Sequence, residues 1–91
     1  MIDLLDFLQS WYSSKCDDSW EHSYGVEISS IDNPGWRVKI TGAAARKQVK
    51  INSERNESDW LIVNASDNEF LGYGGAWNLR ELLGVAVDWL K

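Results

Sequence analysis

Apolar residues at the start of the chain recur every three to four positions, which is the period of an α-helix. The positions are Met1, Leu4, Leu5, Leu8, Trp11 and Tyr12. They form one apolar stripe along a helix that we predict over residues 2–14. Asp3 and Asp6 lie in its first two turns, where carboxylates suit the positive end of the helix dipole. A loop over residues 16–23 follows.

From residue 24 the apolar period changes to two, which is typical of a strand with one covered face. The alternating residues are Tyr24, Val26 and Ile28, then Trp36, Val38 and Ile40. Between them, residues 32–35 contain Pro34 and Gly35, which favour a turn. An odd-length loop, such as residues 33–35, is needed to place both apolar sets on one face. We therefore predict a β-hairpin.

The middle of the chain carries weaker strand signals. Residues 41–45 indicate a turn, and the alternation around residues 49–51 predicts a third strand. Residues 53–58 are polar and predict a loop. Residues 60–63 are apolar at successive positions, which predicts a central or well-covered strand. A turn at residues 66–68 then leads into a short strand at residues 69–71, and the glycines of residues 72–75 predict a flexible connection.

The second helix has the clearest predicted boundary. Asn78 suits the N-cap position, and Glu81 three residues later completes a capping-box pattern. Trp77 and Leu82 have the spacing of a hydrophobic staple. Gly84 is a weak point inside this helix. The apolar stripe that it would bury comprises Leu79, Leu82, Leu83, Ala86 and Leu90.

The order of elements is helix, four or five strands, helix. Short connections favour an antiparallel meander, and two amphipathic helices need an apolar sheet face to cover. The sequence thus predicts an α+β fold: one small domain over residues 1–91, with both helices packed on one sheet face. The length of 91 residues is that of a single domain.

Charge is unevenly distributed along the chain, whose net charge is −5. Residues 1–36 carry seven acids and one base, residues 37–55 six bases and one acid, and residues 56–91 six acids and two bases. An acidic protein repels nucleic acid and attracts basic partners. We therefore expect a protein partner rather than nucleic acid.

Cysteine usage and the N-terminal residues indicate the cellular compartment. A single cysteine cannot form an internal disulfide, which fits a reducing environment. The acids among the first residues contradict the basic start of a secretory signal. No apolar run approaches the roughly 18 residues of a membrane span. We expect a cytoplasmic protein with no membrane contact.

The loop after the first helix holds the chain's densest group of reactive side chains: Cys16, Asp17, Asp18, Trp20, Glu21 and His22. A thiol enzyme could use Cys16 as nucleophile and His22 as base. The acids that follow Cys16 disfavour its thiolate form, however. One histidine and one cysteine also fall short of the three convergent ligands that a metal needs, so we expect no metal and no cofactor.

A second candidate site lies on the polar face of the predicted sheet. Arg37, Lys39 and Lys50 all project from the face opposite the apolar residues. Such a basic face could bind nucleic acid. The alternation places no aromatic side chain among these residues, so the stacking platform of a single-strand binder is missing. Pairing with acids such as Glu27 on the neighbouring strand is the simpler interpretation.

Several short motifs together resemble a known family. The most specific part is Trp20-Glu21-His22-x-Tyr24-Gly25, which is followed by Asn33-Pro34-Gly35-Trp36. Trp11-Tyr12, Asp59-Trp60, Gly74-Gly75, Asn78-Leu79 and Asp88-Trp89 flank them in order. In these motifs the chain resembles the immunity protein 53 family of bacterial polymorphic-toxin systems. The resemblance implies a small cytoplasmic α+β protein that binds and neutralises a cognate toxin domain.

An acidic binder suits a basic toxin such as a nuclease, whose cleft must attract phosphates. On this hypothesis Asp17, Asp18 and Glu21 imitate phosphate charge, and tryptophan is common at binding hot spots, which adds Trp20. His22 completes the candidate partner-binding set. We expect a non-enzymatic protein that is a monomer or a weak dimer. The thiol enzyme and the nucleic-acid-binding module remain the alternatives.

Overall fold

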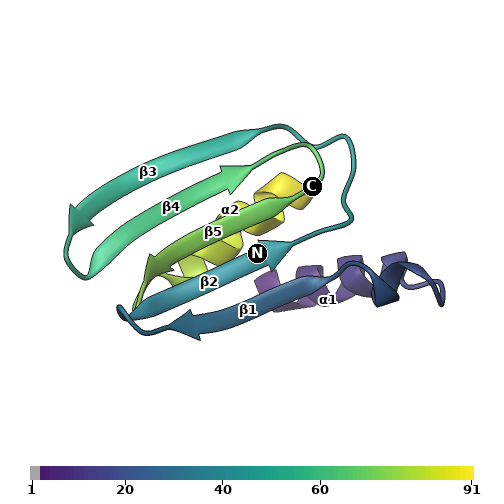
Figure 1. Ribbon diagram of the computed structural model, residues 1–91, viewed down its shortest axis with the longest axis horizontal. Helices are drawn as coiled ribbons and strands as arrows, with labels where there is room; N and C mark the ends of the chain where they lie inside the picture. Colours follow the sequence, from purple (N-terminus) through teal and green to yellow (C-terminus); the bar gives the residue numbers. More distant parts are fainter. Residues whose placement is uncertain (1–2) are drawn as a thin grey trace.

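The computed structural model describes residues 3–91 and shows two helices and a five-stranded antiparallel sheet (Figure 1). The helices are α1 (Leu4–Lys15) and α2 (Leu79–Leu90), and a short 3₁₀ helix, η1 (Trp20–His22), follows α1. The strands are β1 (Val26–Ile31), β2 (Gly35–Ile40), β3 (Val49–Asn56), β4 (Asp59–Ala65) and β5 (Phe70–Gly75). The predicted α+β class is confirmed. Met1, which we placed on the first apolar stripe, lies outside the described residues.

The order of strands across the sheet is β1-β2-β5-β4-β3, and every neighbouring pair is antiparallel. The predicted meander is therefore wrong at one connection. Residues 41–48 carry the chain from β2 to β3 at the far edge, and β5 later inserts between β2 and β4 (Figure 1). Two contacts hold this connection against the rest of the protein. Ala43 is buried, and the backbone N–H of Arg46 donates to the carbonyl of Asp67 at 3.0 Å.

The first hairpin is paired as the alternation predicted. Val26 faces Ile40 and Ile28 faces Val38, so both apolar sets share one face. The loop between the strands contains the three residues 32–34, which is the odd length that this register requires.

The predicted loop at residues 53–58 is wrong, because β3 continues through most of it. Its pairing with β4 extends to Asn56, which faces Asp59, with an irregularity between Glu54 and Asn56. β3 is an edge strand whose side chains are half-buried or exposed. Polar residues are therefore tolerated there, and the sequence pattern alone did not distinguish the strand from a loop.

The predicted flexible connection at residues 72–75 is also wrong, since these residues form the last four positions of β5, the middle strand. A Cβ atom added to Gly72 would lie 2.6 Å from Cδ1 of Leu82 on α2. One added to Gly74 would lie 3.3 Å from Cβ of Asn78. The glycines thus leave room for α2 to approach the sheet closely.

One face of the sheet carries the core, and both helices lie behind that face, as predicted (Figure 1). Its fully buried side chains include Val38, Ile40, Val63 and Phe70 from the strands and Leu82 and Val87 from α2. The helix α1 contributes Leu8 and Trp11 to this core. Leu5 and Tyr12, which we assigned to the same stripe, remain 62% and 39% exposed.

The helix α2 begins where we predicted, but two predicted details of its N-terminal capping are wrong. Asn78 holds the N-cap position without a side-chain hydrogen bond to the helix backbone. Trp77 is 92% exposed, so no hydrophobic staple forms. The buried Asn78 side chain instead donates to Asp59 at 2.9 Å and to Glu81 at 3.1 Å. It therefore joins the start of α2 to β4.

Arg55 of β3 completes this polar cluster. Its guanidinium donates two hydrogen bonds to Glu81, at 2.7 and 3.2 Å, and lies 3.0 Å from the carboxylate of Asp59. The pairing lowers the pKa of Glu81, chiefly through the hydrogen bond from Arg55. The cluster ties the β3–β4 hairpin to the helix.

Candidate functional site

The loop between α1 and β1 is the predicted partner-binding segment, and two of its carboxylates hold it together. The carboxylate of Asp17 accepts hydrogen bonds from the N–H groups of Ser19 at 3.0 Å and Trp20 at 2.8 Å. The carboxylate of Glu21 accepts from the N–H groups of Asp17 at 3.0 Å and Asp18 at 2.9 Å. This reciprocal arrangement fixes the turn into η1.

These contacts also favour the ionised forms of the two carboxylates. The N–H groups of Trp20 and Ser19 lower the pKa of Asp17. The pKa of Glu21 is lowered first by its own backbone N–H and then by those of Asp17 and Asp18. Both side chains are therefore charged and held in place at neutral pH.

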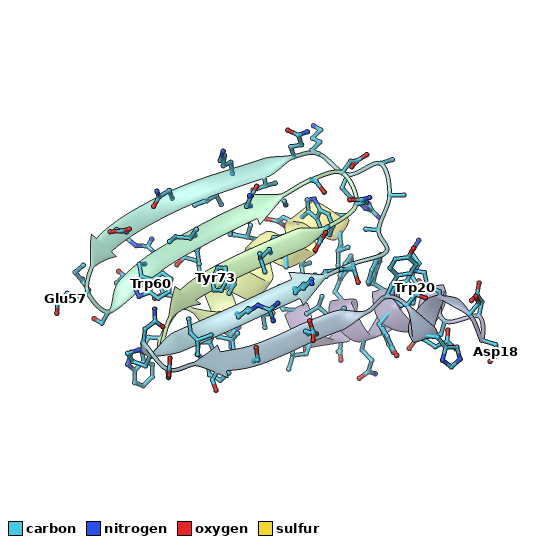
Figure 2. All side chains as sticks on the ribbon, viewed as in Figure 1. Asp18, Trp20, Glu57, Trp60 and Tyr73 are labelled. Carbon is cyan, nitrogen blue, oxygen red and sulfur yellow. The ribbon has the colours of Figure 1, made fainter. Side chains whose placement is uncertain are left out.

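Asp18 differs from the two other acids of the loop. Its backbone has a φ of 74°, in the left-handed region that aspartate tolerates better than most residues. Among the described residues its carboxylate takes part in no hydrogen bond or ion pair. Figure 2 places Asp18 at the outer end of the loop. Its charge is thus the one of the three that is fully available to a partner.

Trp20 is half-buried and anchors the loop to the body of the protein. Its indole N–H donates to the carbonyl of Gly42 at 3.1 Å. Its ring meets that of Trp11 edge to face, with centroids 5.6 Å apart and planes at 80°. It also packs near Tyr12 and Tyr24, at 5.8 and 6.0 Å between centroids. Much of the Trp20 surface is therefore committed to packing within the chain.

Cys16 and His22 are both exposed but are not joined to each other. The thiol of Cys16 donates to the carbonyl of Tyr12 at 3.3 Å, one turn back along α1. Its backbone N–H donates to Ser13 and closes the end of the helix. In the part of the chain that the structure describes, no hydrogen bond links Cys16 to His22. The nucleophile–base pair of a thiol enzyme is thus not assembled in this structure.

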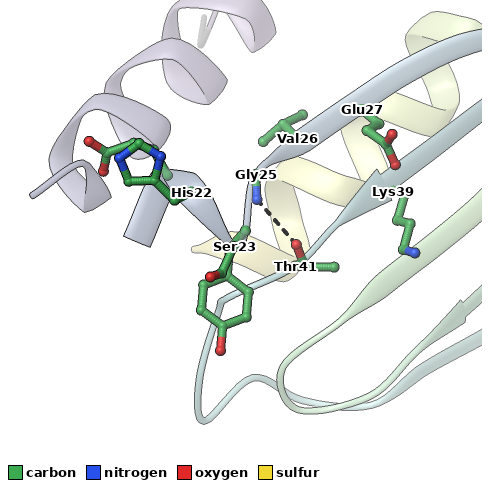
Figure 3. A pocket seen from close by; sticks show the side chains of 9 residues that line it. His22, Ser23, Gly25, Val26, Glu27, Lys39 and Thr41 are labelled. Carbon is green, nitrogen blue, oxygen red and sulfur yellow. Dashed lines mark hydrogen bonds between the residues drawn. The ribbon is translucent and has the colours of Figure 1, made fainter. Parts of the chain in front are cut away.

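His22 instead lines a shallow polar pocket of about 400 Å³ between η1 and the start of the hairpin (Figure 3). Glu27 and Lys39 line it from β1 and β2. Gly25 donates to the Thr41 hydroxyl at 3.1 Å across its base. Residues 3–91 contain no group of three or more metal-ligating side chains that could hold an ion.

The basic residues lie on the outer face of the sheet, the face opposite the described helices α1 and α2 (Figure 1). Arg37 lies 3.8 Å from Glu27, and Lys39 lies 3.8 Å from Glu69. The predicted cross-strand pairing with Glu27 is confirmed. Lys50 projects from the same face on β3 and is exposed.

Our expectation that no aromatic residue lies among these bases is wrong. Tyr73 of β5 is paired directly with Arg37 of β2, and Ile62 of β4 faces Tyr73 on its other side. Trp60 shares this outer face (Figure 2), and a Cβ added to Gly35 would lie 3.3 Å from its ring. The face of Tyr73 could not be assigned from the sequence, because we read residues 72–75 as a loop. The structure also leaves the outer face of β4 open, with Ile62 37% exposed.

A further surface was missed by the sequence analysis altogether. A groove of about 420 Å³ runs between α1 and β1. Its lining is mainly apolar and includes Leu5, Leu8, Tyr12, Tyr24, Val26 and Ile28. The sequence held part of the signal, since Leu5 and Tyr12 belong to the apolar stripe of α1, but it did not show that they stay exposed.

Comparison with known proteins identifies the family. The family model described as immunity protein 53 matches residues 5–91, which is nearly the whole chain. No curated protein and no solved structure matches it. The chain therefore belongs to the immunity protein 53 family, which implies a toxin as its protein partner and suggests a non-enzymatic role. None of the helices within residues 3–91 is long and apolar enough to cross a membrane.

Proposed function

We propose that this chain, as a member of the immunity protein 53 family, binds a cognate polymorphic toxin domain one to one and neutralises it in the cytoplasm. The family match over residues 5–91 carries this proposal. An exposed thiol at Cys16 supports the location, because free surface thiols persist in reducing compartments.

The loop between α1 and β1 supports a basic partner. Asp17 and Glu21 are held by backbone N–H groups before any partner arrives, so binding would cost little ordering of this segment. Asp18 adds a charge with no partner among the described residues. Fixed negative charge of this kind would attract a basic surface on the partner during association. The phosphate-binding cleft of a nuclease is such a surface. We take a nuclease as the toxin class to test first.

The test is titration of the purified protein with a catalytically inactive form of the toxin domain encoded beside its gene. We expect saturation at one to one by calorimetry, and rescue of growth when the protein is produced together with the active toxin. A folded protein that neither binds this toxin domain nor restores growth would contradict the proposal.

The role of the acidic loop is tested by the substitution Asp18→Lys. Because the Asp18 carboxylate makes no hydrogen bond or ion pair in the described structure, this change breaks no side-chain contact of the loop. The left-handed backbone at Asp18 (φ 74°) suits asparagine as well as aspartate, so Asp18→Asn is the companion variant that removes the charge without straining the backbone. At low salt we expect association of the Asp18→Lys variant with the toxin to be at least tenfold slower than for wild type. This difference should shrink as salt is added, because screening slows the wild-type association most.

The matched control is Glu57→Lys, which makes the same charge change in the turn between β3 and β4. Figure 2 shows Glu57 at the opposite end of the molecule from Asp18. Equal slowing by both variants would assign the effect to net charge and would remove Asp18 from the interface.

One observation favours the alternative function, nucleic-acid binding: Tyr73 and Trp60 lie on the basic outer face. A protein that binds single-stranded nucleic acid stacks the nucleobases on aromatic rings that lie among basic side chains. Arg37 and Lys39 already face acids, however, and the chain carries a net charge of −5. A gel-shift assay with a single-stranded oligonucleotide at moderate salt should show no complex. A shift that is lost in Tyr73→Ala would favour this second function.

A further inference from the structure

The groove between α1 and β1 gathers most of the large apolar side chains that are exposed in the described structure. Six such residues are exposed in all, and four of them line this groove: Leu5, Tyr12, Tyr24 and Ile28. Concentrated apolar exposure of this kind marks an interaction surface more often than isolated exposed residues do.

The groove is bordered by a free strand edge, because β1 is the first strand in the order of the sheet. The N–H of Thr41 donates to the carbonyl of Gly25 at 3.0 Å, which sets the phase of hydrogen bonding along the hairpin. Alternation in an antiparallel pair then turns the backbone groups of Val26, Ile28 and Ser30 away from β2. These N–H and C=O groups are available to a further strand.

The two sides of such an added strand would meet different surroundings. Val26 and Ile28 point to the core face, toward the groove and α1. Glu27, between them, points to the outer face, where its side chain is 65% exposed. A strand paired with β1 would therefore place alternate side chains against apolar residues and the others beside a carboxylate.

The charge around the groove indicates the chemistry of the partner. Residues 3–31, which contain α1, the acidic loop and β1, carry six acids and one base. Glu21 and Glu27 line the polar pocket of Figure 3, which shares Tyr24, Gly25 and Val26 with the groove. A basic segment is attracted here. A second copy of this chain is disfavoured, since it would bring two acidic surfaces together.

We propose that an extended, basic segment of the toxin domain binds in this groove and pairs with β1 as a sixth strand. Its apolar side chains alternate with lysine or arginine, so that the former enter the groove and the latter face Glu27. Backbone pairing would supply the affinity and the groove the selectivity. This inference rests on the proposed function and adds where and how the toxin is held.

The first experiment measures amide hydrogen exchange with and without the inactive toxin domain. Among the described residues, the N–H groups of Val26, Ile28 and Ser30 have no backbone partner on β2, so they should exchange quickly in the free protein. In the complex we expect their exchange to slow at least a hundredfold. Wild-type binding that leaves all three amides unprotected would overturn the inference while the proposed function stands.

The second experiment uses proline, which has no N–H to donate. Ile28→Pro removes an outward-facing donor from an edge strand, where proline is tolerated. We expect the dissociation constant for the toxin domain to rise at least tenfold. The control is Asn52→Pro, because the registers across the sheet turn the N–H of Asn52 outward from the opposite edge strand, β3. This control should bind as wild type does.

A third variant makes the result independent of any effect of proline on folding. Leu5→Lys places a cation on the α1 side of the groove at a side chain that is 62% exposed, so the core is untouched. It should weaken binding at least tenfold, while circular dichroism and the melting temperature stay unchanged. Wild-type affinity in a folded Leu5→Lys protein would overturn the inference. Failure of the folded wild-type protein to bind the toxin at all would overturn the proposed function as well.

Discussion

Adding one methyl group at Gly72 should destabilise the protein, because β5 runs through the middle of the sheet directly under α2. The new Cβ would lie 2.6 Å from Cδ1 of Leu82 and 2.9 Å from Cε1 of Phe70. Both side chains are fully buried at 0% exposure, so neither can move into solvent to relieve the contact. Overpacking of a core costs about 1–3 kcal/mol. For a domain below 100 residues, each kcal/mol lowers the melting temperature by about 4–8 °C.

The matched control is Gly84→Ala, which adds the same methyl group inside α2. Apart from its chain neighbours and the nearby backbone of α2 itself, no atom of the described residues lies within 4 Å of the Cβ position at Gly84. Alanine is favoured over glycine within a helix by about 0.5–1 kcal/mol, so this variant should be more stable than wild type. The assay is urea unfolding followed by circular dichroism, with equal slopes required before the midpoints are compared.

The two substitutions should therefore change stability in opposite directions. A neutral result for Gly72→Ala would mean that residues 72–75 form the flexible connection that their composition suggests. The central position of β5 would then be wrong, and with it the assignment of Tyr73 to the outer face. A loss of stability in both variants would instead show that Gly84 is packed more tightly than its open surroundings indicate.

Three further outcomes follow from contacts in the structure. Asp17 and Glu21 have lowered pKa values in the folded protein. Their contribution to stability is therefore present above the ordinary carboxyl pKa, about 4, and is lost as the pH falls through the lowered pKa values. The difference in melting temperature between wild type and the double variant Asp17→Asn, Glu21→Gln should accordingly shrink in acid. Asn78→Ala should cost about 0.5–1.5 kcal/mol in urea unfolding, since it removes the hydrogen bonds that this buried side chain makes to Asp59 and to the N–H of Trp60. Trp20→Phe removes the hydrogen bond to Gly42 and also shrinks the ring that packs against Trp11, so by the same assay it should cost more than a hydrogen bond alone, which is worth about 0.5–1.5 kcal/mol.

The elements that sequence predicted best are those with a strong period over many residues. α2 extends over Leu79–Leu90 and α1 over Leu4–Lys15, close to the ranges that apolar spacing indicated. The first hairpin also paired as the two alternating sets required. In each case one buried face determines the local pattern, so a short window of sequence is sufficient.

What the sequence could not show depends on neighbours distant in the chain. Gly72 and Gly74 are typical of a loop by composition, and only the close approach of α2 explains them within a strand. The strand β3 looks polar because it lies at an edge. The insertion of β5 between β2 and β4 leaves no local signal in the sequence. The predicted order of the strands was therefore wrong, although their antiparallel direction was predicted correctly.

The candidate site shows the same limit. Asp17, Asp18 and Glu21 were grouped by their sign of charge, and composition alone treated them as equivalent. The structure separates them, because Asp17 and Glu21 accept backbone hydrogen bonds while Asp18 does not. Likewise Trp20 was predicted for partner contact from its residue type alone, and the structure shows that its ring is half-buried and packs edge to face against Trp11.

This separation decides how mutations of the loop have to be interpreted. Removing the charge of Asp17 or Glu21 also removes the hydrogen bonds that hold the turn, so slower toxin binding by such a variant could arise from either change. Asp18→Lys breaks none of these hydrogen bonds, and Asp18→Asn removes the charge without straining the left-handed backbone. If electrostatic steering by the loop is the cause, the effect of Asp18→Lys should disappear at high salt. An effect of Asp17→Asn that persists at high salt would then measure the order of the loop, since screening weakens a long-range attraction and leaves the folded turn in place.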